Sequence, residues 1–235
     1  MNLPGSVICL VMPSKVVKSA NTTYTRNVRY NFITIEGCIG AGKTTLAKQL
    51  SRDFNGKLIL EQFEDNPFLP GFYKDPARHA FPVELYFMAE RFQQLKKLLS
   101  EADIFKSFTV SYFLFQKSLI FANNNLSEDE SKLYRTLFDI INPSLPKPDI
   151  ILYLYAPVDK LMDNIRKRGR DYEANIQPEY LDKIQNAYLD YFKHQQHSRV
   201  VLINTEHLNF VDLKKDYGFV TDVLNTEFET GLHYV

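Results

Sequence analysis

The 235-residue chain has no tryptophan, only two cysteines, no excess of charge of either sign and no long apolar run. Cys9 and Cys38 are too few for a disulfide framework and are typical of a reducing compartment. No run approaches the ~18 apolar residues of a transmembrane helix, so no membrane partner is expected. The chain has 28 basic and 28 acidic residues, which argues against a protein built mainly to bind nucleic acid.

The remaining composition is that of a globular protein. Hydrophobic residues make up 45% of the chain and charged residues 24%, which excludes a disordered or fibrous chain. The 18 phenylalanines and 14 tyrosines would supply much of a core. No linker or repeat divides residues 30–235, so we predict one domain there.

The start of the chain differs from the rest. Residues 1–35 contain no acid and four basic residues, Lys15, Lys18, Arg26 and Arg29. We predict that residues 1–29 are an unstructured basic extension outside the domain, on a cytoplasmic protein. Because an acid-poor, serine-rich segment also resembles a transit peptide, an organelle is the alternative location.

Short apolar segments alternate with helical patterns from Tyr30 onward. This alternation predicts an α/β fold with a five-stranded parallel sheet and helices on both faces. The expected strands are Tyr30–Glu36, Lys57–Glu61, Phe108–Phe113, Asp149–Tyr155 and Arg199–Asn204. The expected helices are Lys43–Asp53, Pro82–Glu101, Glu128–Ile141, Val158–Lys167 and Pro178–Lys193. Residues 113–121 fit either the third strand or a following helix.

The strongest motif follows the first strand and opens the first helix. It is the phosphate-binding loop Gly37-Cys38-Ile39-Gly40-Ala41-Gly42-Lys43-Thr44, which matches G-x-x-x-x-G-K-[ST] at every defined position. Its backbone N–H groups and the helix N-terminus would cradle a polyphosphate. We expect Lys43 to reach the β/γ-phosphates and the Thr44 hydroxyl to ligate Mg²⁺. The expected ATP-binding residues are Gly37, Gly40, Ala41, Gly42, Lys43, Thr44 and Thr45.

Three further clusters narrow the choice of acceptor. Glu61 ends the second strand, where a carboxylate can take the proton of an attacking hydroxyl, although a solvated strand end is the alternative. Glu84 and Arg91 lie two turns apart on one helical face and can read a heterocycle, or form an exposed ion pair. The run Arg166-Lys167-Arg168-Gly169-Arg170 is typical of a lid that closes on phosphates, or of a solvated basic helix end.

In this combination the chain resembles the deoxyribonucleoside kinases, from Tyr30 to about Phe192. The P-loop kinase fold and the lid Arg-Gly-Arg-x-x-Glu belong to the resemblance. The bacterial members with purine preference look most similar, through Asp65-Asn66-Pro67-Phe68-Leu69-Pro70 and Phe138-Asp139-Ile140-Ile141-Asn142-Pro143. The resemblance also implies a homodimer.

The resemblance assigns roles to individual residues. It implies that Glu61 is the general base on the 5′-hydroxyl, and that Tyr73 and Glu173 hold the 3′-hydroxyl. Glu84 and Arg91 would face the base. Catalysis would fall to Lys43, Glu61 and the lid arginines Arg168 and Arg170, whereas Arg166 matches no arginine of the family.

Two positions depart from the family pattern. Most members carry an Asp/Glu-Arg-Ser triplet after the third strand, and this chain has Ser111-Tyr112-Phe113 there. Lys117 is the nearest cation: either it or a residue from elsewhere replaces the arginine, or activity is compromised. Lys117 can also be a solvated helix lysine. Glu84 stands where the family usually has glutamine; an ionised carboxylate only accepts hydrogen bonds, which favours guanine unless burial keeps it protonated.

The prediction is an ATP- and Mg²⁺-dependent kinase that phosphorylates the 5′-hydroxyl of a purine deoxyribonucleoside, deoxyguanosine or deoxyadenosine. A nucleoside monophosphate kinase shares the loop and the lid, but its anionic acceptor calls for cations where this chain has Tyr73, Glu84 and Glu173. The third possible function is a regulatory nucleotide-binding module without catalysis. The arginine missing from the family triplet supports this alternative.

Overall fold

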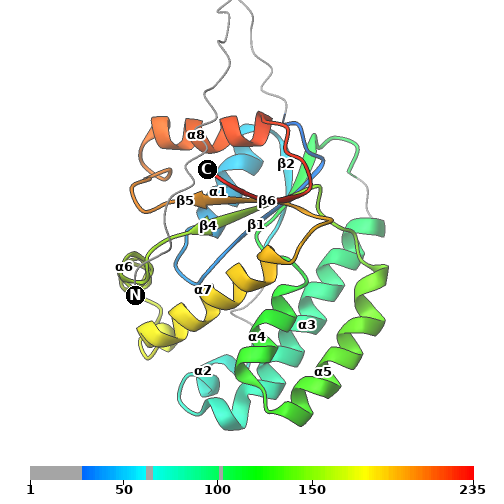
Figure 1. Cartoon of the computed structure of the whole chain (residues 1–235), viewed down its shortest axis with the longest axis vertical. Coiled ribbons are helices and arrows are strands. Elements are labelled where there is room, and N and C mark those ends of the chain that lie inside the picture. Colours follow the sequence, from blue (N-terminus) through cyan, green and yellow to red (C-terminus); the bar gives the residue numbers. More distant parts are fainter. Residues whose placement is uncertain (1–27, 62–65, 101–102) are drawn as a thin grey trace, which may run out of the picture.

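A parallel sheet of six strands lies at the centre of the computed structural model, which describes residues 28–61, 66–100 and 103–235 (Figure 1). The strand order is β2-β3-β1-β4-β5-β6, and every pair is parallel. The strands are β1 (Phe32–Gly37), β2 (Gly56–Ile59), β3 (Phe108–Ser111), β4 (Ile150–Tyr155), β5 (Arg199–Asn204) and β6 (Gly231–Tyr234). The prediction of five strands was therefore wrong by one, because β6 adds to the edge at β5.

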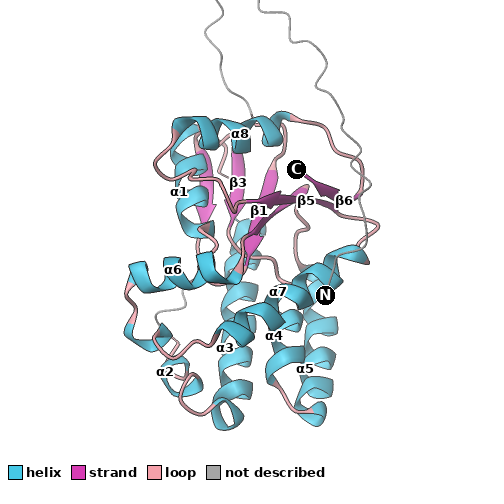
Figure 2. Cartoon of the chain, turned by 60° about the vertical axis from the view of Figure 1, so that its left-hand side comes forward, coloured by secondary structure: helices cyan, strands magenta, loops and turns pink. Residues whose placement is uncertain are grey.

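Helices cover both faces of the sheet, as the alternating pattern predicted. In Figures 1 and 2, α1 and α8 lie on one side of the sheet and α3, α4, α5 and α7 on the other. The helices are α1 (Lys43–Asp53), α2 (Leu69–Phe72), α3 (Pro76–Ser100), α4 (Lys117–Asn125), α5 (Glu128–Ile141), α6 (Val158–Arg168), α7 (Pro178–Lys193) and α8 (Lys214–Asn225). Single turns of 3₁₀ helix occur at Asn142–Ser144 and Asp171–Glu173.

The central strands are apolar along their whole length because both of their faces are covered. In β4 every residue from Ile150 to Leu154 is buried, and in β5 so is every residue from Val200 to Ile203. These strands and the inner faces of α1, α6 and α7 form the main core. The core holds the ends of β1, β2 and β3 at one edge, where the site lies.

Helix α3 begins six residues before the predicted start at Pro82. Proline usually stands in the first turn, because its ring removes one backbone donor and crowds the preceding turn. Here Ala80 and Val83, on either side of the proline, pack against Leu69 and Phe72 of α2. This packing outweighs the local preference. The last residue of the predicted helix, Glu101, lies outside the described residues.

The ambiguous segment 113–121 does not extend the third strand. β3 ends at Ser111, and α4 begins at Lys117. The Ser111 hydroxyl donates to the Phe113 carbonyl at 2.7 Å and accepts from its N–H at 3.1 Å, which turns the chain away from the sheet. The turn brings α4 against α3 and α7 and directs Lys117 toward the end of β2.

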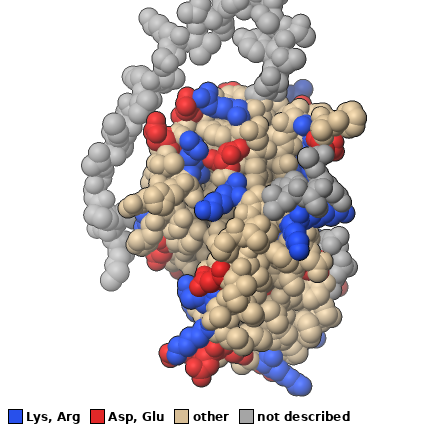
Figure 3. Space-filling view, turned by 90° about the vertical axis from the view of Figure 1, so that its right-hand side faces the viewer, with Lys and Arg blue, Asp and Glu red and all other residues tan. Residues whose placement is uncertain are grey.

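The predicted extension lies outside the described residues except for residues 28 and 29. On the face shown in Figure 3, basic and acidic side chains are interspersed among uncharged ones. No helix in the described part of the chain combines the length and the apolar character needed to cross a membrane.

Candidate active site

The phosphate-binding loop is built as its glycines predicted. Gly40 and Gly42 both have φ of 88°, a left-handed conformation that glycine adopts without strain. A side chain at Gly40 would meet the Leu161 carbonyl of α6 at 2.6 Å, and one at Gly42 would meet the Phe210 ring at 2.9 Å. These close contacts hold the loop against α6 and against the segment that follows β5. Asn164 adds to them, because its amide donates to the Gly40 carbonyl at 2.9 Å.

Lys43 bends back over this loop. Its ammonium donates to the Gly37 carbonyl at 2.8 Å and to the Cys38 carbonyl at 2.9 Å. Burial and the nearby charge of Lys117 lower the pKa of Lys43 to about 8. A bound polyphosphate would offset both effects, because it supplies negative charge at the same place.

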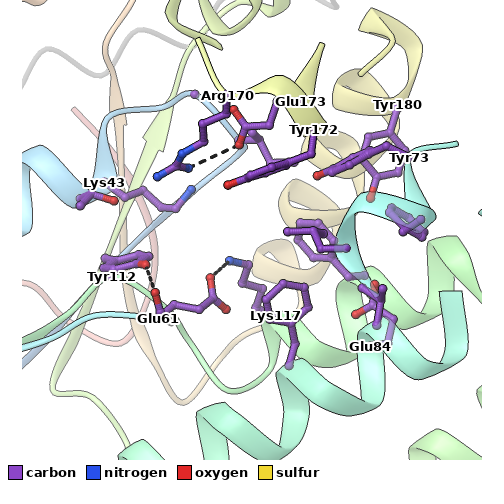
Figure 4. Close-up of a pocket in the computed structure, with 18 of the residues that line it drawn as sticks. Lys43, Glu61, Tyr73, Glu84, Tyr112, Lys117, Arg170, Tyr172, Glu173 and Tyr180 are labelled. Carbon is purple, nitrogen blue, oxygen red and sulfur yellow. Dashed lines mark hydrogen bonds and ion pairs between the residues drawn. The ribbon is translucent and has the colours of Figure 1, made fainter. Parts of the chain in front are cut away.

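Two pockets meet at the loop, and both are lined by Gly40, Lys43, Thr44, Arg168 and Arg170. The inner pocket runs from Lys43 and Glu61 to Tyr73 and Glu84, as Figure 4 shows. The outer pocket lies between the loop, α6 and residues 205–212. The shared residues therefore lie where the two pockets join. A chemical group could be transferred there from a molecule in one pocket to a molecule in the other.

Glu61 lies two residues beyond β2 and is buried in an ion-pair cluster. Arg91 donates to its Oε1 from Nε and Nη2, each at 2.6 Å, and Lys117 Nζ donates to its Oε2 at 2.9 Å. Burial alone would raise the pKa of Glu61, but the two cations outweigh it and hold the pKa at about 2. The carboxylate is ionised at neutral pH, and the alternative of a solvated strand end is wrong.

Lys117 belongs to the site rather than to the solvent. Its side chain is 9% exposed, and its ammonium lies 5.5 Å from the centre of the Phe121 ring. Tyr112, in the stretch that lacks the family's arginine, donates its hydroxyl to the Glu61 carbonyl at 2.6 Å. This chain, which lacks the arginine of the family triplet, thus has Lys117 bound to Glu61. The interpretation of Lys117 as a solvated lysine is wrong.

Arg91 and Glu84 do not pair with each other. Besides its bonds to Glu61, Arg91 donates from Nη1 to the Ser118 hydroxyl at 2.9 Å, so every guanidinium nitrogen has a partner. The guanidinium also lies 5.1 Å from the centre of the Phe87 ring. These contacts place Arg91 as the support of Glu61, and its expected contact with a base stays a prediction.

Glu84 lies at the far end of the inner pocket and is 2% exposed. Its Oε1 accepts from the Asn125 amide at 2.7 Å, while Oε2 has no hydrogen-bond partner among the residues that the structure describes. Burial raises the pKa of Glu84 to about 7, although Arg91, the Asn125 amide and Lys117 act in the opposite direction. The expectation of an exposed ion pair with Arg91 is therefore wrong.

Aromatic side chains form the walls beside Glu84. Tyr73 stacks on Tyr172 with ring centres 6.5 Å apart and planes 13° apart, and Phe72 meets Tyr180 edge to face. Such walls suit a flat ring that carries polar groups on its edge. Tyr73 lines the pocket, and its expected contact with the 3′-hydroxyl stays a prediction.

The lid residues converge on Glu173. Arg168 donates to its Oε2 from Nε at 3.0 Å and from Nη2 at 2.6 Å, and Arg170 Nη1 donates to its Oε1 at 3.4 Å. Gly169 between them has φ of 66° and ends α6. Arg166 is exposed, pairs with Asp163 and lines neither pocket. This agrees with the sequence comparison, in which Arg166 matches no arginine of the family.

Several residues in or beside the pockets were missed from the sequence. Asn125, which donates to the pocket residue Glu84, lies on α4, a helix whose first residues fell in the ambiguous segment 113–121. Lys160 on α6 donates to the carbonyls of Thr205, Glu206 and Leu208, and so fastens the wall of the outer pocket. Tyr180 lies in the first turn of α7, a helix that was predicted correctly, two residues after Pro178.

A phosphate loop and a basic lid that line two adjoining pockets, with an ionised carboxylate in the inner one, define a P-loop kinase. A model of the deoxynucleoside kinase family matches residues 33–228. The chain belongs to the deoxynucleoside kinase family, whose members use ATP as phosphate donor.

Individual relatives agree with this assignment. The chain is 34% identical over 190 residues to a deoxyguanosine kinase of Bacillus subtilis, covering 79% of this chain and 92% of the relative. It is 30% identical to a deoxyadenosine kinase of Dictyostelium discoideum, covering 84% of this chain and 79% of the relative. The structure of a deoxyadenosine kinase from M. mycoides with bound dATP has the same fold, with a TM-score of 0.72 at 23% identity, covering 83% of this chain and all of that one.

Proposed function

We propose that this chain transfers the γ-phosphoryl group of ATP to the 5′-hydroxyl of a purine deoxyribonucleoside. The observation that carries the proposal is the position of Glu61, at the Lys43 end of the inner pocket and opposite Glu84 (Figure 4). A nucleoside in the inner pocket, with its base between the aromatic walls and Glu84, would present its 5′-end to Glu61 and Lys43.

The inner pocket favours a neutral acceptor. Its cations beside Glu61 are already paired with that carboxylate, and the lid arginines contact Glu173. A monophosphate acceptor would add two negative charges next to Glu61 and would have to separate these pairs. A nucleoside adds none, which favours nucleoside kinase over nucleoside monophosphate kinase.

Glu61 would act mainly by orientation. With a pKa of about 2 it is a weak base, so it would not remove the hydroxyl proton before transfer begins. In the loose transition state of phosphoryl transfer the acceptor loses its proton late, and positioning supplies most of the catalysis. Glu61 would accept the hydrogen bond of the 5′-hydroxyl and take its proton as the new P–O bond forms. Lys43, Arg168 and Arg170 would stabilise the charge on the moving group.

Mg²⁺ is part of the proposal as a ligand of Thr44. Thr44 begins the first turn of α1 and lines both pockets, so its hydroxyl fits an ion that is also held by phosphate oxygens. The nearby carboxylate of Glu36 already accepts from Leu114 N, Gly37 N and the Tyr188 hydroxyl. We expect Mg²⁺ to keep several waters and to neutralise charge on the phosphates.

An ADP-release assay tests the function directly. The purified chain with ATP and Mg²⁺ is given each of the four deoxynucleosides, each corresponding monophosphate, or no acceptor. We expect ADP release with purine deoxynucleosides well above the blank. ADP release with monophosphates alone, or with no acceptor at all, would contradict the proposal. The same assay with Lys43→Met identifies any contaminating kinase.

A homodimer and a cytoplasmic location are proposals that rest on the family. Light scattering checks the first, because a dimer doubles the 27.4 kDa mass of the chain. Fluorescence microscopy of the full chain in its host, compared with a chain lacking residues 1–29, checks the second.

A further inference from the structure

Glu84 lines the base end of the inner pocket, and Asn125 supports it through a hydrogen bond without lining the pocket itself. The Asn125 amide donates to Oε1 of Glu84 at 2.7 Å, and the same nitrogen lies 3.3 Å from the Tyr180 hydroxyl. Because Oε1 faces an N–H donor, a carboxyl proton at this position would have to stand on Oε2. Oε2 is the buried oxygen that lacks a partner among the described residues. An unsatisfied buried polar atom is costly, so a ligand group that meets Oε2 is favoured.

We propose that Asn125 and Glu84 together select the purine, and that the proton on Oε2 decides which purine is accepted. The proposal rests on the proposed function, because it places the base beside Glu84. An ionised Glu84 offers two acceptors, which match the adjacent N1–H and N2–H donors of guanine. A protonated Glu84 offers a donor on Oε2 beside an acceptor on Oε1, which match N1 and the amino group of adenine. Deoxyguanosine is therefore preferred at higher pH and deoxyadenosine at lower pH.

Of Glu84 and the charged or titratable groups that face it, Glu84 is the group whose charge changes near neutral pH. Arg91 on α3 and Glu61 after β2 face it as an ion pair, with the pKa of Glu61 at about 2. Lys117 on α4 stands beyond them in the same cluster. The tyrosines that face Glu84 come from three other elements, and burial raises the pKa of each of them: Tyr73 after α2, Tyr134 on α5 and Tyr180 on α7.

The test measures the ratio of kcat/KM for deoxyguanosine to kcat/KM for deoxyadenosine between about pH 6 and pH 8. The ratio cancels titrations that both substrates share, such as those of Lys43 and of ATP. If Glu84 titrates at about 7, the ratio rises with pH, by up to about 100-fold over this range. A ratio that does not change with pH overturns the inference while the proposed function stands.

Two variants separate this role from a structural one. Glu84→Gln does not titrate, so its ratio should be independent of pH; a ratio that still rises as in the wild type overturns the inference. Asn125→Ala removes the donor that favours the ionised form, so the pH at which both purines are used equally well should move to a higher value. Asn124→Ala is the matched control: it is the neighbouring asparagine on α4, its amide donates to the Ile120 carbonyl, and this pH should stay at the wild-type value.

Calorimetry tests the inference without turnover. Near pH 7 the binding of deoxyguanosine should release protons, because it selects ionised Glu84, and the binding of deoxyadenosine should take protons up. The sign is read from the dependence of the binding enthalpy on the buffer. Proton exchange of the same sign for both nucleosides overturns the inference. If neither nucleoside binds at any pH, the proposed function fails together with it.

Discussion

Lys117 and Arg91 hold the two oxygens of Glu61 from opposite sides, the lysine on Oε2 at 2.9 Å and the arginine on Oε1 at 2.6 Å. Lys117 lies on α4 and Arg91 on α3, while Glu61 is the second residue after β2. A buried carboxylate is costly unless it is paired, and here two cations pay that cost. The cluster keeps Glu61 ionised and fixes the direction in which it meets an acceptor.

Replacing Lys117 by methionine tests its part in transfer. We expect kcat and kcat/KM to fall together by about 10²–10³, because the ammonium orients Glu61 and adds charge beside Lys43 in the transition state. Lys117→Arg should recover part of the loss. Lys132→Met, on the exposed surface of α5, is the control and should behave as the wild type. Unchanged kinetics in Lys117→Met would remove the lysine from the reaction.

Lys43→Met should abolish transfer while the fold remains. Its ammonium donates to two loop carbonyls, and the side chain is not part of the apolar core, so we expect its replacement by methionine to preserve the packing. We expect turnover to fall by several orders of magnitude, as for the loss of a group that stabilises the moving phosphoryl. Circular dichroism and the melting temperature check the fold. Turnover near the wild-type value in a folded variant would contradict the assignment of the loop.

Glu84→Gln should stabilise the protein at alkaline pH. The pKa of Glu84 is raised from 4.5 to about 7 in the folded state, so the folded chain binds more protons than the unfolded chain between these values. Stability therefore falls as pH rises through this window, by at most about 3 kcal/mol from this group. Thermal melts at pH 5 and pH 8 compare the two proteins. A difference between them that is equal at both pH values would rule out burial of the charged carboxyl as its cause.

Lys160→Met should weaken ATP binding more than it affects the acceptor. Lys160 fastens three carbonyls of residues 205–208, which form a wall of the outer pocket, and it lies far along α6 from the lid. We expect KM for ATP to rise about tenfold, because the loss of one hydrogen-bonded support has roughly this effect. KM for the deoxynucleoside should stay within about twofold. A rise confined to the deoxynucleoside would show that the wall serves the inner pocket.

Removing residues 1–27 should leave turnover within a few-fold. The sequence places no motif residue there, and the described fold begins its first strand at Phe32. The cut keeps Arg29, which pairs with Glu227, and Tyr30, whose hydroxyl donates to the Thr226 carbonyl at 2.8 Å. Kinetics of the shortened chain with both purine deoxynucleosides provide the measurement. A large loss in a folded protein would mean that the segment supports the site.

The amino-acid sequence alone determined the parts of this protein that depend on local chemistry. The loop motif predicted the phosphate site because its glycines and lysine act through their own backbone and neighbouring helix. The helices α1, α5 and α7 agree with their predicted bounds, since local signals set them: the loop glycine before α1, the capping box before α5 and the proline in the first turn of α7. The pattern of α3 was misread at Pro82, where contacts with α2 outweigh a local preference.

Only the tertiary structure decided how distant side chains meet. Lys117 and Glu61 are 56 positions apart, and Asn125 and Glu84 are 41 apart, so no local pattern predicts either contact. β6 forms because β5 offers an open edge, which its four residues do not reveal. The protonation of Glu84 depends on burial, and burial is a property of the assembled fold. The sequence thus determined which chemistry is available, and the packing of α3, α4 and α7 decided where its charges lie.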